Sequence, residues 1–218
     1  MDRIAILGAG GLGKAIEEAL RSSGRGKQVA GFLDDGRAGE FCGRPVLGRC
    51  ADLAVLSRKY RLTHAILAVG YQYFPARRRI IRLVDRTRCV RWISAVHSSA
   101  SVARGAKLGE GVFLSMGCVV NAGTSIGSHS VLWSGVIVEH DNEIGENVYL
   151  CTGAMTSGYV RIGRDSFVGM GALITQCKVG KSATIGAGSL VLRDVKDRSV
   201  VWGQPAKRVR VKKTDGYL

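Results

Sequence analysis

The sequence has few aromatic residues, few prolines and no long uninterrupted run of apolar residues. Aromatic residues make up 6% of the 218 residues, and three prolines occur in the whole chain. Because no stretch of 18 apolar residues is found, we expect no transmembrane helix. The first residues, Met1-Asp2-Arg3-Ile4, lack the basic region and long apolar core of a signal peptide. We therefore expect a cytoplasmic protein that does not insert into a membrane.

Cysteine pairs with the spacing of metal or redox sites are also missing. None of the six cysteines forms a CxxC pair, so the sequence indicates neither a zinc site nor a disulfide framework. A reducing cytosol fits this pattern. Cys118, Cys151 and Cys177 fall within the repeats described below, where a small buried thiol is the simplest interpretation. No G-x-S-x-G or comparable nucleophile element occurs, so covalent catalysis has no candidate residue.

Acidic residues are about half as frequent as basic ones, 17 against 32, which gives a net charge of +15. This excess raises the possibility of a nucleic-acid partner. However, residues 105–160 contain one lysine against five acidic residues, and no aromatic residues are interleaved with the basic clusters at 77–79 and 207–213. Proteins that bind single-stranded nucleic acids combine basic clusters with interleaved aromatic residues. We therefore expect no nucleic acid, and favour phosphorylated small molecules as partners or a simple solvated surface.

A repeat of six residues is the main feature that the sequence does contain. Between Val102 and Val191 an aliphatic residue recurs at every sixth position, Thr156 is the one interruption, and a single residue is missing after Ile174. The aliphatic positions are Val102, Leu108, Leu114, Val120, Ile126, Leu132, Val138, Ile144, Leu150, Ile162, Val168, Ile174, Val179, Ile185 and Val191. Every third one is followed by glycine: Gly109, Gly127, Gly145, Gly163 and Gly180. Neither a helix nor a simple strand has this period.

The period of six inside a period of eighteen predicts a triangular β-helix of about five coils. Each hexad would form one short strand and a turn, and its aliphatic residue would point inward and stack on the residue eighteen positions later. The position two before the aliphatic residue is mostly small or valine, which suits a narrow interior. Glycines would supply the backbone freedom that tight corners need.

The first 95 residues predict a small Rossmann-like α/β domain. A buried strand at 3–8 leads into Gly8-Ala9-Gly10-Gly11-Leu12-Gly13-Lys14 and an amphipathic helix. This G-x-G-x-x-G pattern favours phosphate binding at the helix N-terminus, where Lys14 could add a point charge. A strand at 29–33 ends at Asp34-Asp35, where an acidic residue commonly bonds a ribose hydroxyl.

The rest of this domain continues the alternation of strands and helices. We predict a helix near 51–59, a strand at 64–69 that ends at Gly70, a helix at 76–84 and a strand at 89–93. NAD binding and binding of a nucleotide-linked substrate are both compatible with it. Because 95 residues amount to half of a dinucleotide fold, a single nucleotide is favoured. The predicted domains are 1–95, the solenoid at 101–206 and a basic tail at 207–218.

Two histidines lie in the repeats, and only one has acidic neighbours. His140 stands between Glu139 and Asp141. A carboxylate can hold the imidazole tautomer and raise its basicity, which a general base near neutral pH needs. His129 has no acidic neighbour, so we expect it at the surface.

With these motifs combined, the chain resembles the left-handed β-helix acyltransferases of the sialic acid O-acetyltransferase and bacterial nucleotide-sugar N-acetyltransferase family. That family includes the UDP-4-amino-sugar and GDP-perosamine N-acetyltransferases. The resemblance rests on residues 6–14, Gly31-Phe32-Leu33-Asp34-Asp35, Val96-His97-Ser98-Ser99-Ala100, Glu139-His140-Asp141 and Gly203-Gln204-Pro205-Ala206-Lys207.

The resemblance implies a mechanism and a set of binding residues. His140 would act as general base, Asp141 would orient it, and the sugar amine or hydroxyl would attack acetyl-CoA directly, without a metal. The family implies a homotrimer with active sites between adjacent β-helices. Coenzyme contacts are implied at Tyr149, Gly158, Met170, Gly171 and Gly188. Nucleotide contacts are implied at Gly10, Gly11, Leu12, Lys14, Asp34, Asp35 and Gly70.

Some positions depart from the family pattern. Family members usually carry histidine where Leu12 stands, proline where Thr152 stands, and a polar turn where Gly70-Tyr71-Gln72-Tyr73 stands. A second histidine, which contacts the coenzyme in some members, is replaced here by Tyr149. The resemblance favours N-acetylation of an amino sugar carried on a nucleotide. O-acetylation of sialic acid or another sugar is the alternative, and a non-catalytic solenoid scaffold is the third. For the tail at 207–213 we expect a solvated segment, with contact to coenzyme phosphates as the alternative.

Overall fold

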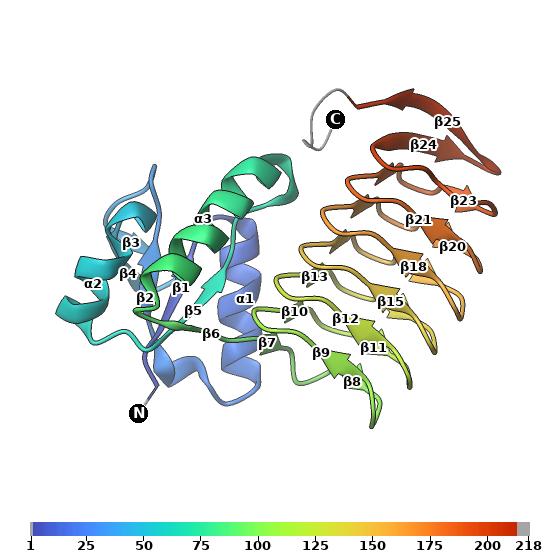
Figure 1. Ribbon diagram of the computed structural model, residues 1–218. Helices are drawn as coiled ribbons and strands as arrows, with labels where there is room; N and C mark the ends of the chain where they lie inside the picture. The colour runs from blue at the N-terminus through green and yellow to red at the C-terminus, as the bar shows by residue number, and fades with distance from the viewer. Residues whose placement is uncertain (1, 213–218) are drawn as a thin grey trace. The chain divides into compact units, whose positions relative to one another are not determined.

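The computed structural model describes residues 2–212 (Figure 1). The chain divides into two compact units, Met1–Ser98 and Ser99–Leu218. The first is a small α/β domain and the second is a left-handed parallel β-helix, as predicted from the sequence. Within the described range, no helix is both long and apolar enough to span a membrane.

The α/β unit is built on one six-stranded sheet of order β3-β4-β2-β1-β5-β6. Its strands are β1 (Ile4–Leu7), β2 (Val29–Leu33), β3 (Glu40–Phe41), β4 (Arg44–Gly48), β5 (His64–Leu67) and β6 (Arg91–Trp92). Its helices are α1 (Gly11–Ser22), α2 (Leu53–Tyr60) and α3 (Phe74–Thr87), with short 3₁₀ turns η1 (Gly26–Gln28), η2 (Cys50–Asp52) and η3 (Tyr71–Tyr73). A two-residue strand, β7 (Ala95–Val96), follows. All pairings are parallel except that of β3 with β4.

The predicted alternation of strands and helices is confirmed, and the hairpin of β3 and β4 is an addition. β1 is buried along its whole length, as a central parallel strand should be. The turn between β3 and β4 consists of Cys42 and Gly43, with φ angles of 50° and 70°. Two left-handed residues give the turn type that suits a tight hairpin. A cysteine at the first of these positions is not a recognisable turn signal, so the sequence did not predict the hairpin.

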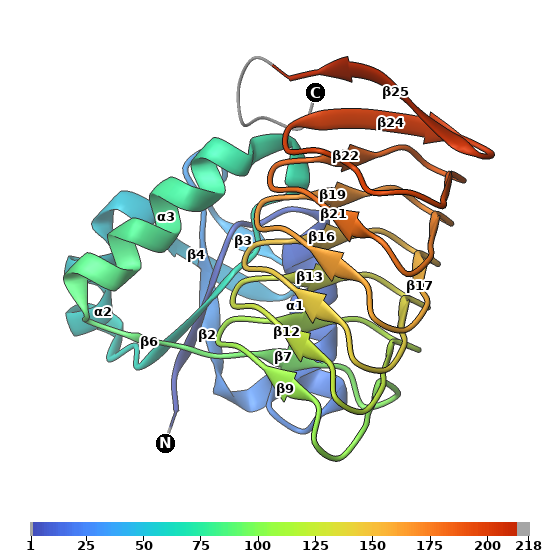
Figure 2. The same cartoon turned by 45° about the vertical axis from the view of Figure 1, so that its right-hand side comes forward.

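The second unit consists of stacked coils of two-residue strands (Figure 2). The strands are β8 (Ser101–Val102), β9 (Lys107–Leu108), β10 (Phe113–Leu114), β11 (Val119–Val120), β12 (Ser125–Ile126), β13 (Val131–Leu132), β14 (Ile137–Val138), β15 (Glu143–Ile144), β16 (Tyr149–Leu150), β17 (Met155–Thr156), β18 (Arg161–Ile162), β19 (Phe167–Val168), β20 (Leu173–Ile174), β21 (Lys178–Val179), β22 (Thr184–Ile185) and β23 (Leu190–Val191). They form three parallel sheets, and each strand pairs with the one eighteen residues later, as Val120 pairs with Val138. At the missing residue the offset falls to seventeen, so Ile162 pairs with Val179.

The aliphatic residues fill the interior of the solenoid, as the repeat predicts. From Leu114 to Val191 all of them are buried, whereas Val102 and Leu108 in the first coil are half-buried. Residues two positions earlier, such as Val136 and Ser166, are also completely buried. The interior is therefore lined by two residues from each hexad.

Left-handed residues stack in columns at the three corners of the coils. Corner A holds Gly111, His129, Asn147, Asp165 and Ser182; corner B holds Gly117, Gly135, Gly153, Gly171 and Gly188; corner C holds Gly105, Gly123, Asp141 and Tyr159. The glycines after the aliphatic residues have a different role. A Cβ on Gly145, for example, would lie 2.7 Å from the backbone nitrogen of Arg164 in the next coil. Close approach of the next coil, not a positive φ, therefore requires glycine there.

The structure corrects the prediction that His129 lies at the surface. Its side chain is buried at corner A, with a residue exposure of 4%. A Cβ at Gly111, one coil earlier, would lie 2.6 Å from Nδ1 of His129, so the imidazole occupies space that this glycine leaves. The column continues with a hydrogen bond of 2.7 Å from Nδ2 of Asn147 to Oδ1 of Asp165. Stacking of coils therefore buries a residue that looks like an exposed corner in the sequence.

The end of the described chain is an antiparallel hairpin of β24 (Ser199–Gly203) and β25 (Ala206–Val211). The expected solvated segment at 207–213 therefore lies largely in a strand. Lys207, Arg208 and Arg210 are exposed, but Lys212 is buried and its Nζ donates to Oγ1 of Thr184 at 3.2 Å. Lys213 and the rest of the predicted tail to 218 lie outside the described residues.

Candidate functional site

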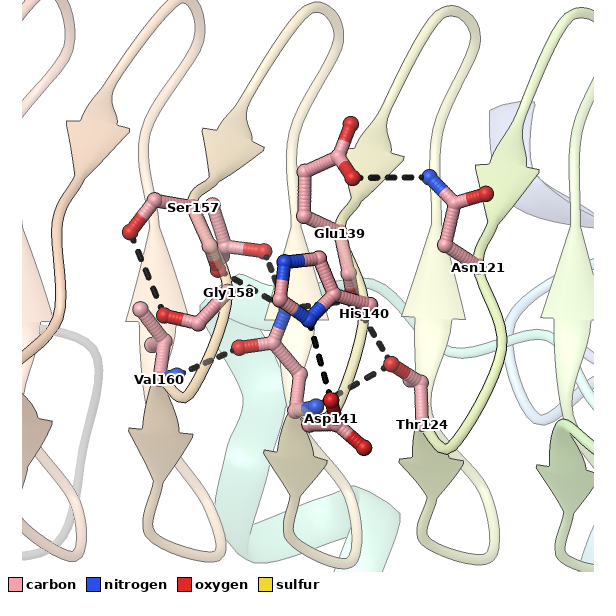
Figure 3. Close-up of polar contacts among 10 residues, drawn as sticks. Asn121, Thr124, Glu139, His140, Asp141, Ser157, Gly158 and Val160 are labelled. Atoms are coloured by element: carbon pink, nitrogen blue, oxygen red, sulfur yellow. Dashed lines mark hydrogen bonds and ion pairs between the residues drawn. The ribbon is translucent and has the colours of Figure 1, made fainter.

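His140 and Asp141 form a hydrogen-bonded pair at corner C, directly after strand β14. Nδ1 of His140 lies 3.0 Å from Oδ2 of Asp141, and both side chains are about half exposed (Figure 3). Asp141 has a φ of 55°, a left-handed conformation that aspartate tolerates better than most residues. This corner conformation turns the carboxylate back toward the imidazole of the preceding residue.

The pairing defines which nitrogen of His140 is available for chemistry. An ionised carboxylate can only accept hydrogen bonds, so Nδ1 carries the proton in this pair. The other nitrogen, Nε2, then has a free lone pair on a ring that is half exposed. This is the arrangement that a histidine general base requires.

Two glycines from neighbouring coils make room for the pair. A Cβ on Gly158 would lie 2.6 Å from Cε1 of His140, and a Cβ on Gly123 would lie 2.2 Å from Oδ1 of Asp141. Both distances are far below van der Waals contact. In the observed geometry, the His140–Asp141 pair therefore occupies space that glycine leaves open in the coil before it and in the coil after it.

Tyr159 and Glu139 complete the surroundings of His140. The rings of His140 and Tyr159 meet edge to face, with centroids 5.3 Å apart and planes at 89°. Tyr159 is largely exposed and has a φ of 62°. Oε2 of Glu139 instead accepts from Nδ2 of Asn121 at 3.0 Å. Of the two carboxylates that flank His140 in the sequence, Asp141 is therefore the one that contacts its ring.

A cleft of about 580 Å³ opens beside Asp141 in the β-helix. Corner C has four residues between strands in earlier coils but three, 175–177, between β20 and β21, with no left-handed residue among them. The one-residue gap in the repeat thus shortens the corner at one end of the cleft. The lining residues are Gly123, Asp141, Glu143, Tyr159, Arg161, Gln176, Cys177, Lys178 and Asp194.

In the α/β unit, the glycine-rich loop lies at the carboxyl end of β1. Gly8 and Gly13 serve packing, since a Cβ on Gly8 would lie 2.7 Å from the carbonyl oxygen of Ala68 and one on Gly13 would lie 2.3 Å from that of Gly8. Gly10 and Gly11 face open space. Gly10 is the N-cap of α1 and no side chain caps the helix. The first backbone N–H groups of α1 are therefore available to an anion.

Comparison with known proteins finds matches to both units of the chain. Residues 3–83 match the PglD N-terminal domain, residues 105–140 match the bacterial transferase hexapeptide (six repeats), and residues 159–193 match the hexapeptide repeat of succinyl-transferase. The solved structure of PerB from Caulobacter crescentus, in complex with CoA and GDP-perosamine, shares 30% identity. The match covers 96% of this chain and 98% of that one, with a TM-score of 0.89. This chain belongs to the PglD/PerB-like hexapeptide acetyltransferases.

Another solved acetyltransferase domain and one curated relative are also similar. The acetyltransferase domain of PglB from Neisseria gonorrhoeae FA1090 shares 31% identity, with 96% of this chain and 100% of that chain covered and a TM-score of 0.88. The same domain has been solved in complex with acetyl coenzyme A. Serine acetyltransferase 2 from Arabidopsis thaliana is 33% identical over 157 residues, 68% of this chain. This chain spans 43% of the length of that curated relative.

The structure does not gather the five predicted coenzyme residues at one place. Met170, Gly171 and Gly188 lie together at corner B, where the N–H of Gly188 donates to the carbonyl of Met170 at 2.8 Å. Gly158 lies at corner C against His140. Tyr149 is buried on β16, where its hydroxyl accepts from Nε1 of Trp133 and its ring stacks on Phe167. Their contacts to a coenzyme stay predictions.

The predicted nucleotide residues are placed more closely together. Oδ2 of Asp34 accepts from the N–H of Ala9 at 2.7 Å, which ties the end of β2 to the glycine-rich loop. Oδ1 of Asp35 accepts from the N–H of Cys50 at 3.0 Å. The side chain of Leu12 is buried on α1, so it contributes to the core. Gly70 is the N-cap of η3, just beyond β5.

Several residues of the site were not predicted from the sequence. Gly123 and Tyr159 belong to coils on either side of His140, and their proximity follows only from the eighteen-residue stacking. Asn142 and Thr156 are buried inside the solenoid near His140, and the sequence did contain a sign of their unusual role. Each stands where other hexads carry a small or aliphatic residue. In the part of the chain that the structure describes, no cluster of three or more His, Cys, Asp or Glu side chains is placed to hold a metal ion.

Proposed function

We propose that this protein is an acetyl-CoA-dependent N-acetyltransferase that acts on the amino group of a nucleotide-linked amino sugar. The observation that carries the proposal is the His140–Asp141 pair, held at 3.0 Å on a corner of the β-helix with Nε2 free. The family supports the choice of substrates, since one relative was solved with CoA and GDP-perosamine and another with acetyl coenzyme A.

In the proposed reaction, His140 acts as the general base. Its Nε2 takes a proton from the amine as the amine nitrogen bonds to the carbonyl carbon of the thioester. Asp141 accepts from Nδ1–H, which keeps the ring in the reactive tautomer and stabilises the imidazolium that forms. When the carbon–sulfur bond breaks, its electron pair leaves with sulfur, and the imidazolium returns the proton to the thiolate. The products are the N-acetylated sugar and free coenzyme A.

The α/β unit would bind the nucleotide part of the acceptor. The open N–H groups at the start of α1, beside Gly10 and Gly11, suit a phosphate group, and Lys14 is exposed on the first turn. Asp34 fixes the loop through Ala9 and through the N–H of Gly36 at 2.9 Å. Because a carboxylate oxygen accepts more than one hydrogen bond, Asp34 retains capacity for a ribose hydroxyl.

The placement of the predicted residues on two edges fits a site between chains, as in the homotrimer that the resemblance to the family implies. His140 lies at corner C, whereas Met170 and Gly171 lie at corner B, on a different edge of the triangular solenoid. A cleft between two adjacent β-helices can combine one edge from each. Light scattering should therefore give about three times the chain mass of 23.3 kDa. A monomeric mass at micromolar concentration would contradict this part of the proposal.

Turnover of the His140→Ala variant is the direct test. Thiol release from acetyl-CoA should fall by roughly 10²–10⁴, the usual contribution of a general base. Unchanged turnover would remove His140 from the mechanism. The matched variant Asp141→Asn keeps a side chain that accepts the left-handed corner but removes the charge. Because its amide nitrogen can donate to Nδ1 and leave the proton on Nε2, its kcat should also fall by orders of magnitude.

The substrate is tested separately from the catalyst. Calorimetry with acetyl-CoA comes first, and absence of binding at millimolar concentration would favour a non-catalytic scaffold. Thermal-shift measurements with UDP-, GDP- and dTDP-linked amino sugars, beside free sialic acid, then compare N-acetylation of a nucleotide-linked sugar with O-acetylation. Stabilisation by free sialic acid alone would overturn the N-acetyltransferase proposal.

A further inference from the structure

The polar residue that interrupts the aliphatic run lies next to the proposed catalytic corner. Thr156 stands at an interior position where the coils before and after carry Val138 and Ile174. Its residue exposure is 3%, so its hydroxyl lies inside the solenoid. A buried hydroxyl is costly unless it finds a partner. The partner of Thr156 is Asn142.

Asn142 is completely buried directly after the His140–Asp141 pair. Its Nδ2 faces three acceptors: Oγ1 of Thr156 at 3.0 Å, the carbonyl of Glu139 at 2.7 Å and the carbonyl of Ser157 at 3.0 Å. Its Oδ1 accepts from the N–H of Val160 at 2.6 Å. Because the backbone N–H of Val160 can only donate, the orientation of the amide is determined.

These contacts join two coils at the points that define the geometry of His140. Glu139 is the residue before His140, and Ser157 is the residue before Gly158, against which the imidazole lies. The carbonyl of Glu139 also accepts from Oγ1 of Thr124 at 2.6 Å, in the preceding coil (Figure 3). The backbone on both sides of the imidazole is thus fixed by one buried amide.

We propose that Asn142 and Thr156 are positioning residues for His140. Asn142 holds the coil that carries the imidazole at a fixed offset from the coil that receives it, and Thr156 supplies the side-chain acceptor for the amide that does so. This inference rests on the proposed function of His140 as general base. Neither residue touches the reacting atoms, and both act through the backbone at 139 and 157.

Buried hydroxyls at corner A provide a comparison. Oγ of Ser166 is buried, donates to the carbonyl of Gly180 at 2.8 Å and accepts from the N–H of Ala183 at 3.1 Å. This resembles the bonds of Asn142 to backbone groups, but it lies away from His140 and includes no second side chain. Ser166→Ala is therefore a matched control for the loss of a buried side-chain bond between coils.

The test uses variants that retain the packing of the coils. Thr156→Val is nearly isosteric and restores the aliphatic run. Asn142→Thr reproduces the residue that Thr124 provides one coil earlier, where Oγ1 accepts from the N–H of Asn142 at 3.1 Å. Both should lower kcat by roughly 10- to 100-fold through misplacement of the base, with little change in KM for acetyl-CoA. Thr156→Ser keeps the hydroxyl and should restore most of the activity.

A spectroscopic readout separates positioning from stability and from the function itself. The chain has four histidines, so the imidazole ¹⁵N signals can be assigned with His140→Ala. In the unaltered protein His140 should show the Nδ1–H tautomer, and in Asn142→Thr its signals should move toward the average of both tautomers. Ser166→Ala should leave them unchanged at a similar loss of thermal stability.

Two outcomes would overturn the inference. Unchanged kcat together with unchanged His140 signals in both Asn142→Thr and Thr156→Val would do so. If Ser166→Ala lowered kcat as much as these two variants, Asn142 and Thr156 would have only a structural role. If the unaltered protein transfers no acetyl group, the proposed function fails, and the imidazole signals alone decide whether the pair orients His140.

Discussion

The imidazole of His140 lies in the space that a side chain at position 158 would fill. A Cβ on Gly158 would be 2.6 Å from Cε1 and 2.7 Å from Nε2 of the ring. The backbone at this corner does accept a side chain, since Ala122 stands at the same position two coils before Gly158. Gly158 is therefore required by the ring of His140 and not by the turn.

This relationship predicts the effect of Gly158→Ala. The new methyl group would displace the imidazole from Gly158 and from its alignment with Asp141, so kcat should fall while the solenoid stays folded. The free energy of unfolding should also fall, because the ring cannot move without losing contacts. Turnover assays and urea unfolding of the single variant measure both effects.

A double-mutant cycle provides the control for this prediction. In a His140→Ala background the clash is absent, so Gly158→Ala should cost much less stability than in the unaltered protein. For residues in contact the coupling energy is about 0.5–3 kcal/mol. An equal cost in both backgrounds would mean that the ring does not occupy this space.

Tyr159 predicts a second effect, on backbone strain. Its φ of 62° is a left-handed conformation, which costs most residues about 1–2 kcal/mol and asparagine less. Tyr159→Asn relieves that strain but loses the edge-to-face contact with His140, worth about 0.5–1.5 kcal/mol. We expect a small net change in the free energy of unfolding, measured by urea denaturation.

Arg198 is the matched control for Tyr159. It is exposed, has a φ of 56° and lies in a later coil. Arg198→Asn should therefore show relief of strain alone and stabilise the protein by about 1 kcal/mol. If the free energy of unfolding rose as much in Tyr159→Asn as in Arg198→Asn, the contact between the rings of Tyr159 and His140 would contribute nothing to stability.

The sequence predicts the solenoid well because each six-residue repeat corresponds to one strand and one turn of a coil. An aliphatic residue at every sixth position determines which side chains enter the interior, and the glycine-rich loop with its flanking strand and helix predicts the α/β unit. The corners are harder to predict, because their contacts join residues eighteen or fourteen positions apart. His129 and His140 both lie at corners of the repeat, yet Gly111 allows one to be buried and Gly158 accommodates the other at the surface.

The same limit explains why the residues that support His140 could not be predicted from the sequence. Nothing in the local sequence of Asn142 indicates that its amide reaches Thr156, because the contact depends on how one coil lies on the next. The interruption of the aliphatic run at Thr156 was visible in the sequence, but its meaning was not. Irregular positions in a strict repeat are therefore the places to examine first for functional support.

The cysteines predict a pattern of chemical labelling. Burial raises the pKa of Cys118 to about 11, of Cys151 to about 12 and of Cys177 to about 11, and burial is also the largest cause that raises the pKa of Cys50 to about 12. Since the thiolate is the reactive form, these four thiols should resist labelling near neutral pH. Cys42 is exposed and should react first.

Thiol titration with Ellman's reagent measures this prediction, and mass spectrometry of peptides identifies the labelled sites. Native protein should react rapidly at Cys42 and more slowly at the half-buried Cys89. The other four should react only after denaturation. Cys42→Ser should remove the rapid phase, and a rapid phase that persists in this variant would contradict the burial of the remaining thiols.

His64 predicts how the stability of the protein depends on pH. Burial at the start of β5 is the largest cause that lowers the pKa of this imidazole below its ordinary value of 6.5, while the Asp2 carboxylate acts in the opposite direction. The unfolded chain therefore binds a proton more readily than the folded one, and stability falls as the pH drops below 6.5. His64→Gln should make the decline in stability between pH 7 and pH 5 shallower. Asp2→Asn should make it steeper, because it removes the one charge that raises the pKa of His64 and leaves Arg91 and Arg25, which lower it. Urea unfolding at each pH measures the slope, and identical slopes in the unaltered protein and His64→Gln would show that this histidine does not contribute to it.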